Sequence, residues 1–185
     1  YNGDNAKEFG EQKYQESIKN FQQMEKRFKE LPHTRIVMTG TSPYDETAQI
    51  KDNTVFKKKN ETIKRIIEYQ RESAARNGWE FTDWNAPMVA INQELQQKDP
   101  SFTLCGNDRI HPDNDGHMVM AYLFLKAQGF AGKDVANMEI NANKKQAVKA
   151  EGCTISNIKK IGKDISFDYL AEALPYPLLS LIHIS

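Results

Sequence analysis

The sequence has no excess of charge of either sign. Its 185 residues include 25 Lys and Arg and 25 Asp and Glu, so the formal net charge at pH 7 is zero. Proteins that bind nucleic acid through its phosphates need a basic surface field, and this composition supplies no overall field of that kind. A nucleic-acid partner is therefore not expected.

Long hydrophobic runs are also lacking. The longest apolar stretches, 118–125 and 178–182, are far shorter than the roughly 20 residues that a membrane-spanning helix requires. We therefore expect no membrane span. The polar stretch from Tyr1 to Phe9 does not have the pattern of a signal peptide.

Cysteine and histidine are scarce. Cys105 and Cys153 are too few for a disulfide framework, so the sequence leaves two alternatives, a single bond between them or two buried thiols, and favours the thiols. No pair of histidines has the His-x-x-x-His spacing of a zinc site, and no glycine-rich loop has phosphate-binding spacing. We predict no metal and no cofactor.

The hydrophobic pattern alternates between the periods of helices and strands. Helical periodicity covers 12–30, 54–77, 87–97 and 114–128, and short apolar runs typical of buried strands lie at 35–39 and 79–83. Alternating strands and helices imply right-handed crossovers and a parallel sheet that is covered on both sides. The predicted fold class is α/β, a three-layer α/β/α sandwich.

The pattern changes after Gly132. Two β-rich segments, 153–158 and 165–169, are separated by a short lysine-rich stretch and predict a small C-terminal β hairpin. The predicted domains are therefore 1–132 for the sandwich and 133–177 for an appended β-rich segment. The last residues, 178–185, resemble translated sequencing-adapter read-through and are interpreted as a non-native tail, with a genuine final strand as the alternative.

Two loops carry the candidate functional residues. In open α/β sheets ligands bind beyond the carboxyl ends of the strands, which directs attention to 39–45, directly after a strand, and to 105–112, directly before a helix. In the second loop Asp108 and His111 form an Asp-x-x-His pair. The carboxylate can orient the imidazole through Nδ1 and leave Nε2 to act as a general base. The alternative is an ordinary helix cap followed by a surface histidine.

Other polar residues of these loops are candidates for contact with a ligand. Tyr44 and Asp45 are expected at the rim of the pocket, and Arg109 is interpreted either as a ligand for an acidic substrate group or as a solvated or salt-bridged side chain. Ser42 follows a strand, but it lacks the pattern of a nucleophile elbow and is expected to form a turn.

The segment 108–121, which reads DRIHPDNDGHMVMA, resembles the final conserved block of the SGNH (GDSL-type) esterases and acylhydrolases. The stretch IVMTGTSPYD at 36–45 is similar to the strand and loop that follow this family's third block, and the likeness extends over about 9–130. The resemblance implies a flavodoxin-like sandwich and a Ser-His-Asp triad completed by Asp108 and His111.

The family's Gly-Asp-Ser nucleophile turn and its oxyanion-hole glycine and asparagine are not found in this sequence. The resemblance therefore implies an N-terminally truncated, C-terminal part of an ester hydrolase that is inactive by itself. Its substrate would be a small-molecule or carbohydrate ester. Because such esterases often carry signal peptides, the parent protein is a candidate for secretion or the periplasm.

A non-catalytic ligand-binding or carbohydrate-binding module, in which Asp108 and His111 are relics, is the alternative function. Phosphoryl or nucleotide chemistry ranks last, because the sequence shows no phosphate-binding loop. The sequence gives no indication of acyl specificity or oligomeric state.

Overall fold

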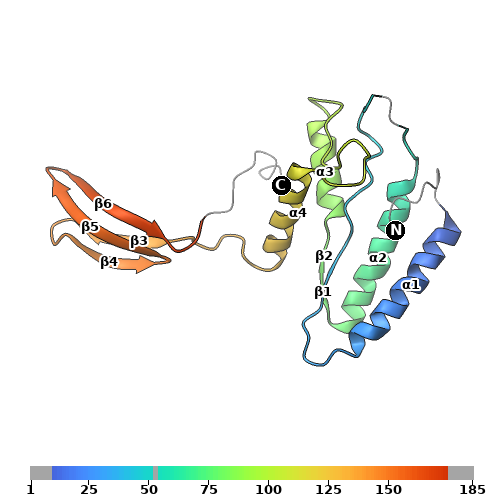
Figure 1. Cartoon of the computed structure of the whole chain (residues 1–185), viewed down its shortest axis with the longest axis horizontal. Helices are drawn as coiled ribbons and strands as arrows, with labels where there is room; N and C mark the ends of the chain where they lie inside the picture. The colour runs from blue at the N-terminus through green and yellow to red at the C-terminus, as the bar shows by residue number, and fades with distance from the viewer. Residues whose placement is uncertain (1–9, 52–53, 175–185) are drawn as a thin grey trace. The chain divides into compact units, whose positions relative to one another are not determined.

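The computed structural model describes residues 10–51 and 54–174, which divide between Gly129 and Phe130 into two compact units (Figure 1). The structure is a mixture of helices and small sheets, which confirms the α/β class in its broad sense. The tail predicted at 178–185 lies outside the described residues.

Within the described residues 10–51 and 54–129, the first unit has four helices and two strands, all of which the sequence predicts. The elements are α1 (Glu11–Lys29), β1 (Val37–Thr39), α2 (Lys59–Asn77), β2 (Glu80–Thr82), α3 (Asn85–Leu95) and α4 (Asn114–Ala127). Among the described residues, none of the helices is long and apolar enough to cross a membrane.

Helix α2 begins five residues later than the periodicity suggests. Lys58 has a left-handed backbone with φ of 63°, which interrupts a right-handed helix. The Glu46 carboxylate accepts hydrogen bonds from the backbone N–H groups of Lys58 and Asn60, at 2.9 and 2.8 Å. These bonds satisfy donors that the first helical turn leaves free. An acceptor from the preceding loop therefore sets the start of the helix.

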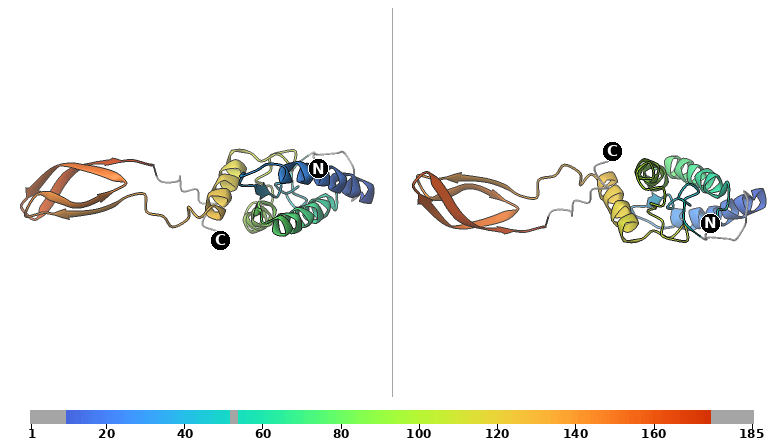
Figure 2. Two further views of the ribbon diagram at one scale, coloured as in Figure 1. Left: turned by 90° about the horizontal axis from the view of Figure 1, so that it is seen from below. Right: turned by 90° about the horizontal axis from the view of Figure 1, so that it is seen from above.

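Strands β1 and β2 pair in parallel, with Val37 opposite Glu80 and Thr39 opposite Thr82. Helices α1 and α2 lie side by side (Figure 2) and both contribute to the core beside this pair. Phe21 of α1, Met38 of β1 and Ala74 of α2 are buried there together. The predicted parallel pairing is confirmed for these two strands, whereas the three-layer sandwich remains a prediction.

One edge of β1 faces β2 and the other does not. The backbone N–H of Glu80 donates to the Ile36 carbonyl at 3.1 Å, and that of Gly40 donates to the Thr82 carbonyl at 2.8 Å. Because successive residues of a strand direct their backbone groups to opposite edges, Val37 and Thr39 direct theirs away from β2. No other strand among residues 10–51 and 54–174 pairs with this outer edge.

The second unit consists of two antiparallel pairs. Strand β3 (Asn137–Asn141) pairs with β4 (Gln146–Glu151), and β5 (Cys153–Ile161) pairs with β6 (Asp164–Ala171). The sequence predicts the second pair and misses the first. Most side chains of β3 and β4 are exposed, so these strands lack the apolar alternation that marks a half-buried strand.

Both cysteines are free and buried, Cys105 in the first unit and Cys153 in the second. The alternative of two buried thiols is therefore confirmed, and the disulfide is wrong.

The edge of β1 gives a testable prediction. In hydrogen-exchange experiments on the 185-residue chain, the amides of Val37 and Thr39 should exchange roughly tenfold or more faster than that of Gly40, which is bonded to β2. NMR of the amide-labelled protein measures all three rates. Equal protection of the three amides would show that the outer edge of β1 is covered.

Candidate active site

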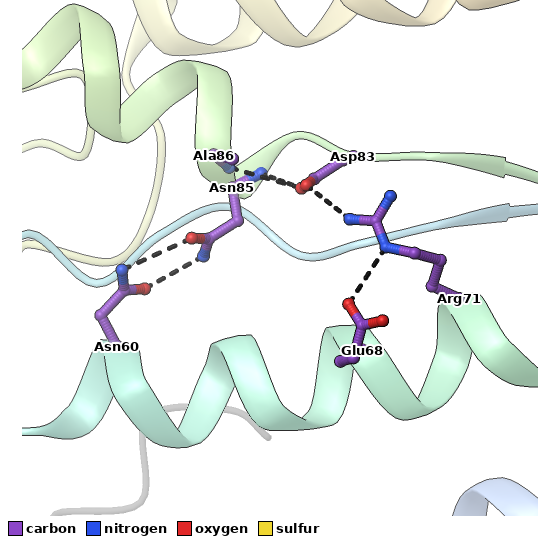
Figure 3. A network of polar contacts seen from close by, with 6 residues as sticks. All are labelled: Asn60, Glu68, Arg71, Asp83, Asn85 and Ala86. Carbon is purple, nitrogen blue, oxygen red and sulfur yellow. Dashed lines mark hydrogen bonds and ion pairs between the residues drawn. The ribbon is translucent and has the colours of Figure 1, made fainter.

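Polar contacts fix the start of α3 against α2 (Figure 3). The Asp83 carboxylate, directly after β2, accepts hydrogen bonds from the backbone N–H of Asn85 at 2.9 Å and from Arg71 of α2 at 2.9 Å. The side chains of Asn60 and Asn85 bond to each other in both directions, at 3.0 and 3.4 Å. Asn85, the first residue of α3, is thereby held through both its backbone and its side chain. This contact fixes the start of the helix and so positions the residues farther along it.

The loop before α4 is joined to α3 by a buried amide. The Asn92 side chain, 2% exposed, accepts from the backbone N–H of Leu104 at 2.9 Å and donates to the Asp45 carboxylate at 3.1 Å. Asp113 caps α4 by accepting from the Gly116 N–H at 2.9 Å, and its own N–H donates to the Leu104 carbonyl at 3.2 Å. The two ends of the loop that contains Asp108 and His111 are thus fixed.

Gly116 is required by a close approach of α4 to this loop. A Cβ atom at this position would lie 2.2 Å from the Leu104 carbonyl oxygen and 2.8 Å from Cβ of Pro112. Only glycine allows the first turn of α4 to lie so close to the loop.

Asp108 and His111 form a hydrogen-bonded pair between the two anchors. Oδ2 of Asp108 lies 2.5 Å from Nδ1 of His111. Oδ1 of the same carboxylate accepts from the backbone N–H groups of Ile110 and His111, at 3.1 and 3.0 Å. The imidazole is 83% exposed, so an external molecule can reach it. Because the carboxylate uses Nδ1, Nε2 is the nitrogen left to exchange a proton with a bound molecule.

The environment of Asp108 favours its charged form. Partial burial raises the pKa of this carboxyl, but the hydrogen bonds from the His111 ring and from the backbone N–H groups of His111 and Ile110 outweigh it. The pKa of Asp108 therefore lies below its ordinary value. An ionised carboxylate at this place orients the imidazole and stabilises the imidazolium that forms when His111 takes up a proton.

Tyr44 and Asp45 line a cavity of about 320 Å³ with Lys58, Lys64 and Asn92 among its other walls. Their side chains are each 3% exposed, and their polar atoms have partners within the protein. The Tyr44 hydroxyl accepts from the Phe56 N–H at 3.0 Å, and the Asp45 carboxylate accepts from Asn92 and from Gln96 at 3.1 and 3.0 Å. Contact with a ligand through these two residues remains a prediction, and what the structure describes is their part in holding the loop.

Arg109 lies inside the protein rather than at its surface. Its side chain is 1% exposed, and Nη1 donates to the backbone carbonyls of Asp45 and Ala48, at 3.1 and 2.8 Å. This burial corrects the expectation that Arg109 is solvated, and its contact with an acidic substrate group remains a prediction. The physical reason is the loop 45–48, whose carbonyls approach from more than sixty residues away and supply acceptors for the guanidinium.

Two groups near the pair that could act as nucleophiles are occupied or unreactive. The Ser42 hydroxyl is buried and donates to the Ile110 carbonyl at 3.3 Å, a contact between two distant loops rather than within the turn that the sequence predicts. Burial, with the negative charges of Asp45, Asp113 and Asp108, raises the pKa of the Cys105 thiol to about 12. A thiol with this pKa carries almost no thiolate near neutral pH.

The role of Asn92 and Gln96 is not predicted by the sequence pattern. They lie four residues apart, so they share one face of the segment that contains α3, and both bond to the Asp45 carboxylate. Two amides at this spacing, on the same face as the apolar residues of the helix, are the signal that could have suggested a buried acceptor. Among the described residues, no three His, Cys, Asp or Glu side chains lie close enough together to hold a metal ion.

No family model and no curated protein matches the chain. A solved structure does match, that of BT4096, a gut microbial diltiazem-metabolizing enzyme, with 99% sequence identity and a TM-score of 0.82. The match covers 97% of this chain. The chain spans 41% of the length of that enzyme. The two proteins therefore share their sequence and fold over the matched part.

The close approach at Gly116 predicts an unusual sign for a helical substitution. Gly→Ala in a helix normally stabilises by about 1 kcal/mol. Because the added methyl would meet Leu104 and Pro112, Gly116→Ala should instead lower the free energy of unfolding by about 1–3 kcal/mol. Urea denaturation measures the change, with the exposed neighbour Asp115→Ala as the control. A stabilised Gly116→Ala variant would contradict the packing.

The lowered pKa of Asp108 predicts a pH dependence of stability. A carboxyl whose pKa is lower in the folded state contributes its full stabilisation above the unfolded pKa of about 3.9, and loses it as the pH falls through the folded value. The difference in urea midpoint between the wild type and Asp108→Asn should therefore shrink between pH 5 and the acid limit. The same comparison in a His111→Ala background should show a smaller change. A constant difference over this range contradicts the prediction.

Proposed function

We propose that this chain is part of an ester hydrolase in which His111 is the general base and Asp108 orients it. The observation that carries the proposal is the hydrogen bond of 2.5 Å between Asp108 and Nδ1 of an exposed imidazole. The alternative is that Asp108 is an ordinary helix cap next to a surface histidine. The structure favours the pair over this alternative, because Asp113 and not Asp108 caps α4. The pair then has the arrangement of the second and third members of a hydrolytic triad.

The comparison supports an enzyme that acts on a small molecule. The chain is 99% identical to part of a diltiazem-metabolizing enzyme, and diltiazem contains an acetate ester. We propose that the reaction is hydrolysis of this ester or of a similar one. The resemblance of 108–121 to SGNH esterases agrees with this choice, and with a three-layer sandwich for 1–132 to which 133–177 are appended.

The proposed chemistry has two steps. Nε2 of His111 takes the proton of a serine hydroxyl while the serine oxygen attacks the acetyl carbonyl, and the imidazolium then gives that proton to the departing alcohol. Water hydrolyses the acetyl-enzyme with the same histidine as base. The resemblance places the serine and the oxyanion donors outside the 185 residues. The 185-residue chain is therefore expected to hydrolyse esters no faster than a free surface imidazole.

The test replaces the residues that correspond to His111 and Asp108 in the longer enzyme whose solved structure matches this chain. His111→Ala and Asp108→Asn should each lower kcat for diltiazem deacetylation by about 10²- to 10⁴-fold, because each removes general acid–base catalysis. Product formation is followed by chromatography. His117→Ala, which changes an exposed histidine six residues away, is the matched control and should leave kcat unchanged.

The 185-residue chain by itself is assayed in parallel with p-nitrophenyl acetate. Turnover that His111→Ala abolishes in this short chain would contradict a nucleophile outside it. Unchanged deacetylation in both variants of the longer enzyme would reject the hydrolytic role. If the chain then still bound diltiazem, the alternative of a non-catalytic binding module would take its place.

A further inference from the structure

The turn that joins Asp108 to His111 contains a residue with an unfavourable backbone. Arg109 has φ of 67°, in the left-handed region that residues other than glycine, asparagine and aspartate rarely adopt. Its N–H donates to the carbonyl of Gly106 at 3.2 Å, and Gly106 is itself left-handed with φ of 58°. Such a conformation persists only where the surroundings impose it. The contacts of Arg109 with the rest of the protein must therefore hold this turn in place.

Hydrogen bonds at both the backbone and the side chain of Arg109 impose this conformation. Its backbone carbonyl accepts from the Asp45 N–H at 2.8 Å, and its guanidinium donates to the Asp45 and Ala48 carbonyls at 3.1 and 2.8 Å. One residue is thus bonded three times to the same short loop. Both side-chain bonds come from Nη1, whose two hydrogens lie in the rigid plane of the guanidinium and so fix the two carbonyls relative to each other.

The loop that receives Arg109 is itself held firmly. Oδ1 of Asp45 accepts from the N–H groups of Thr47 and Ala48, at 2.9 and 3.1 Å, which closes the loop on itself. Oδ2 accepts from Asn92 and Gln96. The carbonyls that bind the guanidinium are therefore fixed by α3 and do not adapt to a displaced side chain.

We propose that Arg109 is a positioning residue, whose buried guanidinium holds the turn so that the Asp108 carboxylate meets Nδ1 of His111. The proposal rests on the proposed function. The guanidinium donates to the carbonyls of Asp45 and Ala48, and it acts on the pair through the backbone that joins Asp108 to His111. Without the guanidinium, the turn can leave the left-handed conformation, and the carboxylate and the imidazole separate.

The test removes the guanidinium but keeps the backbone preference. Arg109→Gly allows the same positive φ but also adds backbone freedom, so rescue by free guanidinium is the step that isolates the side chain. In the 185-residue chain, the hydrogen-bonded Nδ1 proton of His111 should give a downfield proton NMR signal, identified by its loss in Asp108→Asn. This signal should vanish in Arg109→Gly and return when millimolar guanidinium ion fills the vacated space. Ammonium ion at the same concentration should not restore it.

Kinetics in the longer enzyme separate positioning from substrate binding. Arg109→Gly should lower kcat for ester hydrolysis by roughly 10- to 100-fold, as expected for a displaced catalytic group, and leave KM within about twofold. Arg109→Lys keeps the charge without the planar guanidinium, and its kcat should lie between those of the wild type and Arg109→Gly. His33→Gly, which replaces an exposed residue that also has a positive φ in the same unit, is the matched control and should change neither constant.

The outcomes of these experiments separate the positioning role of Arg109 from the proposed hydrolytic function. A downfield signal that survives in Arg109→Gly, or a loss that guanidinium does not reverse, overturns the positioning role. If Arg109→Gly fails to fold, Arg109→Lys carries the comparison, and an undiminished signal in that variant likewise overturns it. If His111→Ala leaves hydrolysis intact, the proposed function fails, and the NMR comparison still decides whether Arg109 holds the pair together.

Discussion

The carboxylate of Asp45 is the interaction on which the rest of the site depends. It accepts hydrogen bonds from its own loop and from the side chains of Asn92 and Gln96, so that two segments far apart in the sequence meet at one buried group. A buried carboxylate is tolerable only where its oxygens are fully hydrogen-bonded, and here they are supplied with donors from several directions. The loop it stabilises then offers its carbonyls to Arg109.

In this arrangement an exposed side chain is supported by buried residues. The imidazole of His111 is open to solvent and Asp108 is partly exposed, whereas Arg109 and Asp45, which hold the turn beside them, are both buried. Hydrogen bonds to solvent-exposed groups are weakened by competition with water, so exposure alone would leave the pair loosely held. The buried part supplies the rigidity that a positioned base needs.

The sequence predicts the elements of the first unit well because their signals are local. The spacing of Ile18 and Phe21 marks the buried face of α1, and the Asp-x-x-His spacing is enough to suggest the pair, which the structure brings together. The burial of Arg109 could not be predicted, since it depends on backbone carbonyls of a loop more than sixty residues away, and a backbone acceptor has no sequence pattern. Strands β3 and β4 escaped detection for a related reason, because they bury little apolar surface.

The second unit differs from the first in what holds it together. Cys153 is the one buried side chain among the described residues 130–174, so the unit depends mainly on its strand-to-strand hydrogen bonds and cross-strand contacts. Backbone hydrogen bonds are indifferent to side-chain identity, while a packed core responds to the loss of a single methylene. Over evolutionary time, the outward positions of these strands are therefore free to diverge far faster than the residues around Asp45.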